Sequence, residues 1–379
     1  MTDCIVVGAG PAGACAARRA AERGLKTVCF EKERFPRHKP CGGALSMNGV
    51  KALGFALPET VQEGLVYGLR AIYGDRRMEA RRSRPIAVMV RREAFDHLLM
   101  EKARESGAEI HMEQRVLRLE EAEAHVTVET STGVYQSRYV ILAHGATGIL
   151  NRRHPGPGTK GPRWKAVTRR LDASAPWLCS RKDDGMLEFF FDAYPHGYGW
   201  VFPLRGAFSI GVGGLHHSRW QTGKAFGGFL KRLGASRESR YSGSAIPCCG
   251  IAPVLGSRRI LYAGDAGGFG EAFSGEGIFY AMRSGQLAAD TIADAVQGTL
   301  RLPLPQAYRS RCLQVLGDNL IYAAFFARWV YYFPGFFVAL FARKPPWARD
   351  FLGIPMGETT YKRFLLNRFS RGLLGNTGR

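Results

Sequence analysis

Three glycines near the start of the chain, Gly8, Gly10 and Gly13, have the spacing of a dinucleotide-binding turn. An apolar run at residues 4–7 precedes them, and an alanine-rich stretch of helical composition, residues 11–23, follows. In such a turn the first glycine permits the tight bend, the second lets the backbone approach a pyrophosphate, and the third allows close packing of helix and strand. The N-terminus of the helix directs N–H groups at phosphate oxygens.

An acidic residue completes this unit. Glu31 follows a second short apolar run, residues 27–30, and its carboxylate can accept a hydrogen bond from a ribose 2′-hydroxyl. The same charge would repel a 2′-phosphate. The sequence therefore predicts a site for FAD or NAD rather than NADP.

A cysteine lies in the loop that leaves the second strand. Cys41 belongs to the segment KPCGGALS, residues 39–46, and follows Arg37, His38 and Lys39. Neighbouring cations could favour the thiolate form of Cys41. A catalytic role for Cys41 close to the cofactor is implied by the family resemblance described below. A packed thiol in a rigid loop is the alternative.

Three large aromatic residues alternate along one predicted strand. Tyr198, Trp200 and Phe202 share one face because successive side chains of a strand point to opposite sides. They could form a wall for an apolar substrate chain, and Tyr198 and Trp200 are also candidate catalytic residues. The alternative is that this face is ordinary core, since aromatic residues dominate cores as well as sites.

Length and composition indicate a globular protein of at least two domains. The chain has 379 residues, of which 46% are hydrophobic and 22% charged. The first strand begins almost at Met1, which predicts a cytoplasmic protein without a signal peptide. The eight cysteines form no CxxC pair, so neither a metal site nor a redox dithiol is expected.

The net charge of +21 has several possible explanations. Nucleic acid, an anionic membrane and a phosphorylated substrate are the candidate partners of so basic a chain. No motif of a nucleic-acid-binding module is visible, so no nucleic-acid partner is expected. A basic surface exposed only to solvent is the remaining explanation.

One aromatic segment stands out near the C-terminus. Residues 320–342 carry a single charge, Arg328, and a central Pro334. The length would permit a membrane span, but the charge is costly in lipid and the proline breaks a helix. With the basic tail at 343–379, the segment favours peripheral contact with an anionic membrane, on its inner face. An ordinary helical cap over the core is equally compatible.

Four segments in order resemble the geranylgeranyl reductase family of flavoproteins, within the group built like p-hydroxybenzoate hydroxylase. They are the glycine turn with Glu31, the KPCGG segment at 39–43, the YxWxFP segment at 198–203, and Gly264-Asp265-Ala266 with the Gly-Glu-Gly segment at 275–277. Arg92 also resembles an arginine of the family that reaches FAD. Two departures are that Glu271-Ala272-Phe273 stands where the family often has proline, and that His144 replaces the usual acid of a later turn.

The resemblance implies an α/β fold, α+β overall. A Rossmann-like FAD-binding domain, an inserted antiparallel-sheet substrate domain and a C-terminal helical segment are expected. The predicted FAD-binding domain comprises residues 1–65, 90–155 and 255–300; the substrate domain 66–89 and 156–254; and the C-terminal helical, aromatic and basic segment 301–379. Helices are expected at 11–23, 94–106 and 218–233.

The resemblance also implies the cofactor and its residues. FAD is expected, with the substrate at Tyr198, Trp200 and Phe202 and no metal. The predicted FAD-binding residues are Gly8, Gly10, Pro11, Ala12, Gly13, Glu31, Lys32, Cys41, Gly42, Arg92, Gly264, Asp265, Gly275, Gly277 and Ile278.

The implied activity is the reduction of carbon–carbon double bonds in a prenyl chain on a lipid, quinone or diphosphate. No second dinucleotide unit is visible, so NAD(P)H, if it is the external electron donor, is expected to bind transiently. A ferredoxin-like protein and a quinol-type donor are the alternatives. The alternatives are a flavin-dependent monooxygenase or halogenase acting on a small hydrophobic substrate, and a lipid-binding flavoprotein with structural FAD. Tyr198 and Phe202 occupy places that halogenases give to Trp and Ile, which disfavours halogenation.

Overall fold

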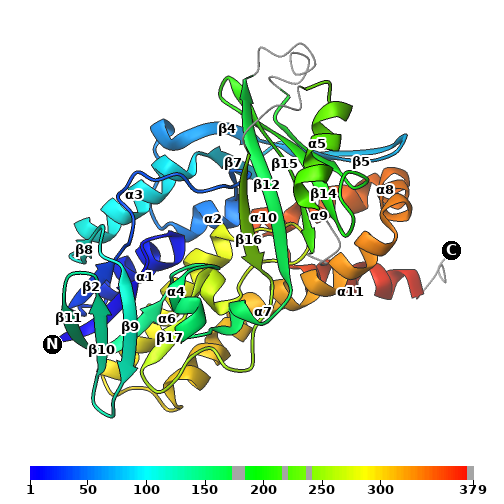
Figure 1. Ribbon diagram of the computed structural model, residues 1–379. Helices are drawn as coiled ribbons and strands as arrows, with labels where there is room; N and C mark the ends of the chain where they lie inside the picture. The colour runs from blue at the N-terminus through cyan, green and yellow to red at the C-terminus, as the bar shows by residue number, and fades with distance from the viewer. Residues whose placement is uncertain (173–183, 216–220, 236–240, 374–379) are drawn as a thin grey trace.

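Two seven-stranded sheets form the framework of the computed structural model, which describes residues 1–172, 184–215, 221–235 and 241–373 (Figure 1). The last residues of the predicted basic tail, 374–379, therefore lie outside the described residues, as do 218–220 at the start of the helix expected at 218–233.

The first sheet carries the glycine turn. Its order is β8-β2-β1-β11-β10-β9, with β17 also paired to β11, and β1 is parallel to both β2 and β11. Side chains of β1 alternate between two cores: Cys4 and Val6 pack under the helices, and Ile5 and Val7 pack on the side of β9 and β10. The bounds are β1 Thr2–Val7, β2 Thr27–Phe30, β8 Glu109–His111, β9 Val116–Glu121, β10 Val126–Thr130, β11 Val134–Leu142 and β17 Ile260–Tyr262.

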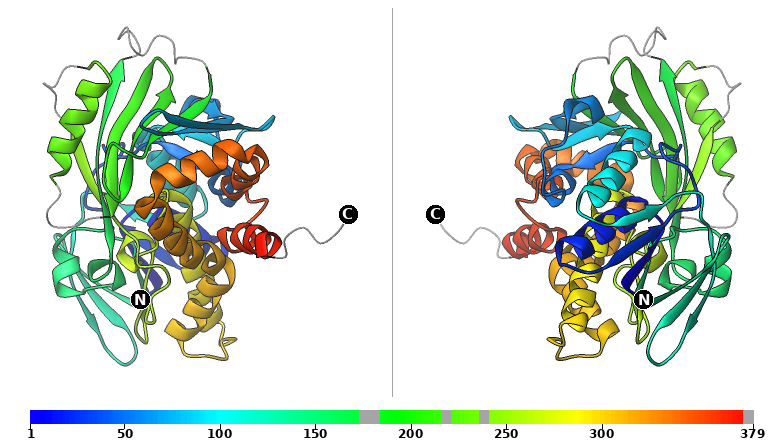
Figure 2. Two further views of the ribbon diagram at one scale, coloured as in Figure 1. Left: turned by 90° about the vertical axis from the view of Figure 1, so that its right-hand side faces the viewer. Right: turned by 90° about the vertical axis from the view of Figure 1, so that its left-hand side faces the viewer.

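The second sheet is antiparallel except for the parallel pair β13 and β5. Its order is β16-β12-β15-β14-β13-β5-β6, so residues 68–81 join strands that lie about a hundred residues later in the chain. Helix α5 covers one face of this sheet, and α8 lies on the other side (Figure 2). The bounds are β5 Gly68–Tyr73, β6 Arg76–Arg81, β12 Arg163–Asp172, β13 Met186–Phe190, β14 Gly197–Leu204, β15 Ala207–Leu215 and β16 Ser242–Pro247.

A small sheet of order β3-β7-β4 follows the KPCGG loop. Its strands are β3 Ala44–Ser46, β4 Gln62–Val66 and β7 Ala87–Val90. The helices that flank the sheets are α1 Pro11–Glu22, α2 Met47–Ala52, α3 Arg92–Glu105, α4 Ile149–Arg153, α5 Thr222–Arg232 and α6 Ile278–Val296, with 3₁₀ turns η1 Glu59–Val61, η2 Pro157–Thr159 and η4 Gly264–Gly267.

The C-terminal segment is helical, as expected. Its helices are α7 Leu304–Tyr332, α8 Pro334–Arg343, α9 Pro345–Phe351, α10 Gly353–Met356 and α11 Tyr361–Leu373. The aromatic stretch 320–342 is the end of α7 plus α8, and the chain breaks at Pro334 as the sequence predicts. Among the described helices none could cross a bilayer alone by length and hydropathy; α7 and α8 meet that criterion only as a pair bent by 102°.

Candidate active site

One continuous cavity of about 750 Å³ joins the two large sheets and the C-terminal helices. At one end it is lined by the glycine turn and Glu31, and at the other by the aromatic face of β14 and side chains from α7 to α11. Every predicted site residue lines it except Gly13 and Gly264. The sequence motifs are thus brought to one place, although they come from four distant parts of the chain.

Gly13 and Gly264 act through packing instead. A β-carbon on Gly13 would lie 1.7 Å from the carbonyl oxygen of Gly8, so only glycine lets α1 approach the turn. A β-carbon on Gly264 would lie 2.8 Å from that of Ala12, and its φ of 59° is left-handed. Both glycines therefore allow close backbone packing behind the cavity wall, although neither lines the cavity.

The nucleotide end has the features that a pyrophosphate requires. Gly8 has a φ of 96°, and a β-carbon there would lie 2.7 Å from the carbonyl oxygen of Ala143. Helix α1 begins at Pro11 with Gly10 as its N-cap, and no side chain caps it. The first N–H groups of the helix are therefore available to an anion, and FAD fits this cradle.

Glu31 is more engaged than the sequence indicated. Its side chain is 4% exposed, and its two carboxylate oxygens accept the backbone N–H groups of Ala9 at 2.7 Å and Glu33 at 3.0 Å. It therefore fixes the glycine turn to the end of β2, and it lines the same end of the cavity as Lys32.

The KPCGG loop lies against a buried ion pair. Arg92 donates through Nε and Nη2 to the two oxygens of Asp96, at 2.7 and 2.8 Å, and also contacts the thiol of Cys41. Asp96 is fully buried, and Arg37 approaches it at 3.4 Å. Burial opposes the charge of Arg92, but Asp96 outweighs this and the pKa of Arg92 is raised. Cys41 is thus held beside a permanent positive charge.

Asp265 follows β17 on η4 and faces two cations across the cavity. Burial raises the pKa of Asp265, and the charges of Lys39 and Arg92 oppose the rise. The pKa of Lys39 is lowered by burial, with Asp265 opposing that shift. The carboxylate can accept hydrogen bonds from cofactor hydroxyl groups at this point of the cavity.

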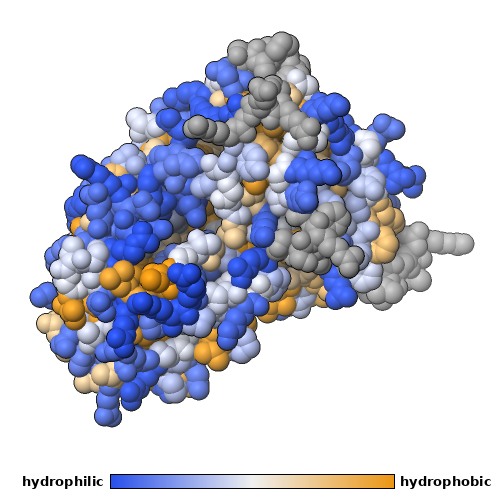
Figure 3. All heavy atoms as spheres, in the orientation of Figure 1, coloured by the Kyte–Doolittle hydropathy of each residue, from blue (hydrophilic) through white to orange (hydrophobic). Residues whose placement is uncertain are grey.

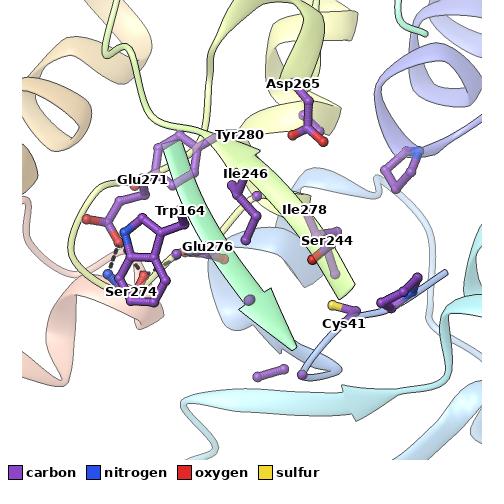
Figure 4. A pocket seen from close by; sticks show the side chains of 18 of the residues that line it. Cys41, Trp164, Ser244, Ile246, Asp265, Glu271, Ser274, Glu276, Ile278 and Tyr280 are labelled. Atoms are coloured by element: carbon purple, nitrogen blue, oxygen red, sulfur yellow. Dashed lines mark hydrogen bonds between the residues drawn. The ribbon is translucent and has the colours of Figure 1, made fainter. Parts of the chain in front are cut away.

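The loop before α6 contains two acids that the motifs did not mark as site residues. Glu271 is 1% exposed and accepts the backbone N–H groups of Phe273 and Ser274, both at 2.6 Å, and the Ser274 hydroxyl. The Oε1 atom of Glu276 is buried and has no hydrogen-bond partner among the described residues. Figure 4 shows both acids on this loop, with the ring of Trp164 beside them. A β-carbon on Gly275, between the two acids, would lie 3.4 Å from Cε3 of Trp164, so the loop packs directly against that ring.

The aromatic face of β14 closes the other end. Tyr198 donates its hydroxyl to the carbonyl oxygen of Ser274, and its ring centroid lies 5.0 Å from that of Trp164. Burial and the charge of Glu271 raise the pKa of Tyr198, so its hydroxyl stays protonated. The indole N–H of Trp200 lies 3.4 Å from the Ser209 hydroxyl. Both rings line the cavity, and both also belong to the buried core.

Several residues that line the cavity belong to none of the sequence motifs. Trp164 lies at the start of β12, and its N–H donates to the carbonyl oxygen of Ala272 at 2.9 Å. The C-terminal helices add a group of apolar side chains that only the tertiary fold brings here: Phe326, Val330, Phe337, Val338, Phe341, Phe351, Ile354 and Tyr361. The excess of aromatic residues in 320–342 was the one sequence signal for them. Within the described residues, no cluster of His, Cys, Asp or Glu is arranged to hold a metal ion.

Comparisons with known proteins identify relatives over about three quarters of the chain. The model of the FAD-dependent oxidoreductase family matches residues 3–148. A geranylgeranyl diphosphate reductase of Rhodobacter capsulatus is 30% identical over 298 residues, which are 76% of this chain and 74% of the relative. A menaquinone reductase of Mycobacterium tuberculosis is 30% identical over 328 residues, 76% of each chain.

Solved structures share the fold. A geranylgeranyl bacteriochlorophyll reductase-like protein of Thermoplasma acidophilum superimposes with a TM-score of 0.78 at 20% identity, covering 98% of this chain and 96% of that one. A flavin-dependent brominase gives a TM-score of 0.73, also at 20% identity, with 98% and 99% covered. At such identities the likeness extends to the architecture alone.

Proposed function

Because the chain belongs to the geranylgeranyl reductase family of FAD-dependent oxidoreductases, we propose that it saturates carbon–carbon double bonds of a prenyl chain carried by a lipid, a quinone or a diphosphate. The observation that carries the proposal is the continuity of the cavity from the nucleotide turn to a far end built of aromatic and aliphatic side chains. A prenyl chain has no polar handle, so shape and apolar contact are what can hold it.

The far end offers few polar groups to a substrate. The hydroxyl of Tyr198, which lines this end, is already donated to the carbonyl oxygen of Ser274. What remains toward the cavity is ring surface, including Phe202 and Phe273. This lining excludes water and orients an apolar chain along the path to the cofactor.

The chemistry that bound, reduced FAD supplies is hydride donation to one carbon of the double bond, while the other carbon takes a proton. The chain's own contributions are positional and electrostatic. The backbone at Gly275 and Gly277 would approach the cofactor closely, and the N–H groups of the first turn of α1 would bind its phosphates. Asp265 and Glu31 offer carboxylate oxygens to its hydroxyl groups.

We assign Cys41 to the proton path or to the shape of the reacting centre. Its thiol lies beside the guanidinium of Arg92, on the loop that packs against Trp200 and Phe202. Replacement of Cys41 by alanine should lower turnover while leaving FAD bound. Unchanged turnover and unchanged products would remove the catalytic role.

An external donor must reduce the cofactor again after each cycle. The net charge of +21 favours encounter with an acidic redox protein such as a ferredoxin, and transient NAD(P)H is the competing donor. Anaerobic bleaching of the flavin absorbance by one donor and not the other decides between them.

The function is tested by mass spectrometry. Prenyl diphosphates, prenylated quinones and prenyl ether lipids are incubated without oxygen with the FAD-loaded, dithionite-reduced protein. A gain of two hydrogens per double bond is expected, and the lipid that responds names the substrate class. No gain with any class, although FAD is bound and reducible, would contradict the proposal. Oxygen consumption that depends on an aromatic substrate would then favour the monooxygenase or halogenase alternative.

A further inference from the structure

An exposed aromatic surface lies at the junction of α7 and α8. It consists of Phe325, Trp329, Tyr332, Phe333 and Phe336, which are 49–62% exposed, and we call it the aromatic elbow. The rings of Phe325 and Trp329 lie 6.2 Å apart, and those of Trp329 and Phe333 stack at 6.4 Å. Large aromatic side chains gathered on one exposed face indicate an interaction site.

Another face of the same helices lines the apolar far end of the cavity. Phe326 and Val330 of α7 are buried, as is Val338 of α8, and all three line it. Phe325 and Trp329 are four residues apart, so they share one face of α7. Phe326 and Val330, each one residue later, share the adjacent face, which lines the cavity. One layer of helix therefore separates the aromatic elbow from the cavity.

Cations lie within and beside the aromatic elbow along the chain. Between Asn319 and Trp347 the only charged residues are Arg328, Arg343 and Lys344, and all three are exposed. Arg76, on the edge strand β6, adds a fourth cation by donating to the carbonyl oxygen of Gly335 at 2.8 Å. In Figure 3 hydrophobic atoms reach the surface over α8, at the right-hand edge of a mostly hydrophilic face.

We infer that the aromatic elbow docks on the surface of an anionic phospholipid bilayer. Trp, Tyr and Phe beside Arg and Lys are the composition of a surface that rests at the headgroup level. The bend of 102° between α7 and α8 allows both helices to present side chains to one plane. The cations match the charge of anionic headgroups.

The position of the elbow also suggests a route for substrate, and this step rests on the proposed function. A prenyl chain resident in the bilayer would meet the protein one helix away from the apolar end of the cavity. Docking would then bring the chain to α7 and α8 without passage through water.

Vesicle binding tests the docking. FAD-loaded full-length protein is sedimented with phosphatidylcholine vesicles, with and without phosphatidylglycerol. We expect binding only with phosphatidylglycerol, and weakening by added salt. The variant Phe325→Ser/Trp329→Ser/Phe336→Ser should bind at least about tenfold more weakly, because it removes the apolar contact. The variant Arg328→Gln/Arg343→Gln/Lys344→Gln should lose about 100-fold, at roughly 1 kcal/mol per cation.

Two matched variants control for composition. Lys224→Gln/Lys231→Gln/Arg301→Gln makes the same charge change at exposed cations elsewhere, and Val134→Ser/Val254→Ser removes exposed apolar side chains elsewhere. Both should bind vesicles like the wild type. All variants should keep the flavin spectrum, since none of the altered residues lines the cavity.

Three outcomes would overturn the inference. They are equal binding to neutral vesicles, equal losses in the control variants, and a stable dimer in solution that only the aromatic variant dissociates, which would make the elbow a contact between copies. Activity on a prenyl substrate dissolved in detergent distinguishes a failure of docking from a failure of the proposed function. If the aromatic variant reduces the dissolved substrate normally but does not reduce substrate held in vesicles, the docking inference holds and the activity is intact. If neither the wild type nor the aromatic variant reduces any prenyl lipid, only the proposed function fails.

Discussion

Gly42 lies directly beneath the ring of Phe202. A β-carbon on Gly42 would be 3.2 Å from Cε2 of Phe202 and 3.6 Å from the indole nitrogen of Trp200. The KPCGG loop and the aromatic strand, about 160 residues apart in the sequence, therefore form one wall, and the thiol of Cys41 is positioned by the backbone that touches these rings.

This contact makes Gly42→Ala a mild but local perturbation. The added methyl group must displace Phe202 by a few tenths of an ångström, and the ring can yield toward the cavity. We expect the free energy of unfolding to change by less than about 1 kcal/mol while turnover falls several-fold. The neighbouring Gly43→Ala is the control. Gly43 has a φ of 87°, and a β-carbon there would lie 2.8 Å from the carbonyl oxygen of Val90. The alanine should therefore lower the free energy of unfolding by about 1–3 kcal/mol. Urea unfolding and turnover measured together check the pair, and equal effects of the two variants on both would argue against this wall.

We expect Asp96 to be essential for stability because it is the bidentate partner of Arg92. Its replacement by alanine leaves a guanidinium, whose side chain is 10% exposed, without its bidentate partner. The expected loss is about 3–5 kcal/mol in urea unfolding. Lys102→Ala on the same helix breaks the exposed pair with Glu105 and should cost less than about 1 kcal/mol. A loss at Asp96 no larger than that at Lys102 would show that the buried pair is not needed.

Tyr198 and Tyr331 allow a matched test of hydroxyl groups. Both donate to backbone carbonyl oxygens of the same loop, at Ser274 and Phe273. Each Tyr→Phe change should cost about 1–3 kcal/mol, because a buried carbonyl loses its donor. We expect Tyr198→Phe to lower turnover more, since Ser274 precedes Gly275, which we propose as a point of close approach to the cofactor. Equal turnover in the two FAD-loaded variants would limit Tyr198 to a structural role.

The sequence predicted the parts of the site that local geometry dictates. Gly8, Gly13 and Glu31 follow from a strand, a turn and a helix that are contiguous in the chain, and the structure places them as such a unit. The break at Pro334 was equally local. Trp164 could not be found in this way, because nothing in its neighbourhood distinguishes a strand residue beside a cavity from one in a core.

The acids of the loop before α6 escaped prediction for a different reason. Glu271 and Glu276 have the sequence context of polar loop residues, and in most loops such side chains face water. Tertiary packing buries Glu271, and the Tyr198 hydroxyl and the Trp164 ring contact the same loop. The apolar end of the cavity likewise depends on how α7 to α11 fold back over β14, a long-range arrangement that no spacing in the sequence encodes.

Glu276 should make stability depend on pH near neutrality. Burial raises its pKa from 4.5 to about 7; hydrogen bonds from the N–H and O–H of Ser46 oppose the rise, and the like charge of Glu271 adds to it. Between these two pH values the folded protein holds a proton that the unfolded chain has released. The free energy of unfolding should therefore fall as pH rises from 4.5 to 7.

The variant Glu276→Gln removes this titration and keeps the size of the side chain. Urea unfolding of wild type and variant across that pH range should show a wild-type curve that falls by on the order of 2 kcal/mol more than the variant's. A shallower slope persists in the variant because burial also raises the pKa of Glu271. Ser46 ends the KPCGGALS segment, and Glu276 lies in the Gly-Glu-Gly segment. The variant Ser46→Ala removes the hydroxyl donor, so it should raise the pKa of Glu276 further and extend the fall in stability to higher pH. Parallel curves for wild type and Glu276→Gln would mean that the carboxylate is solvated in the folded protein.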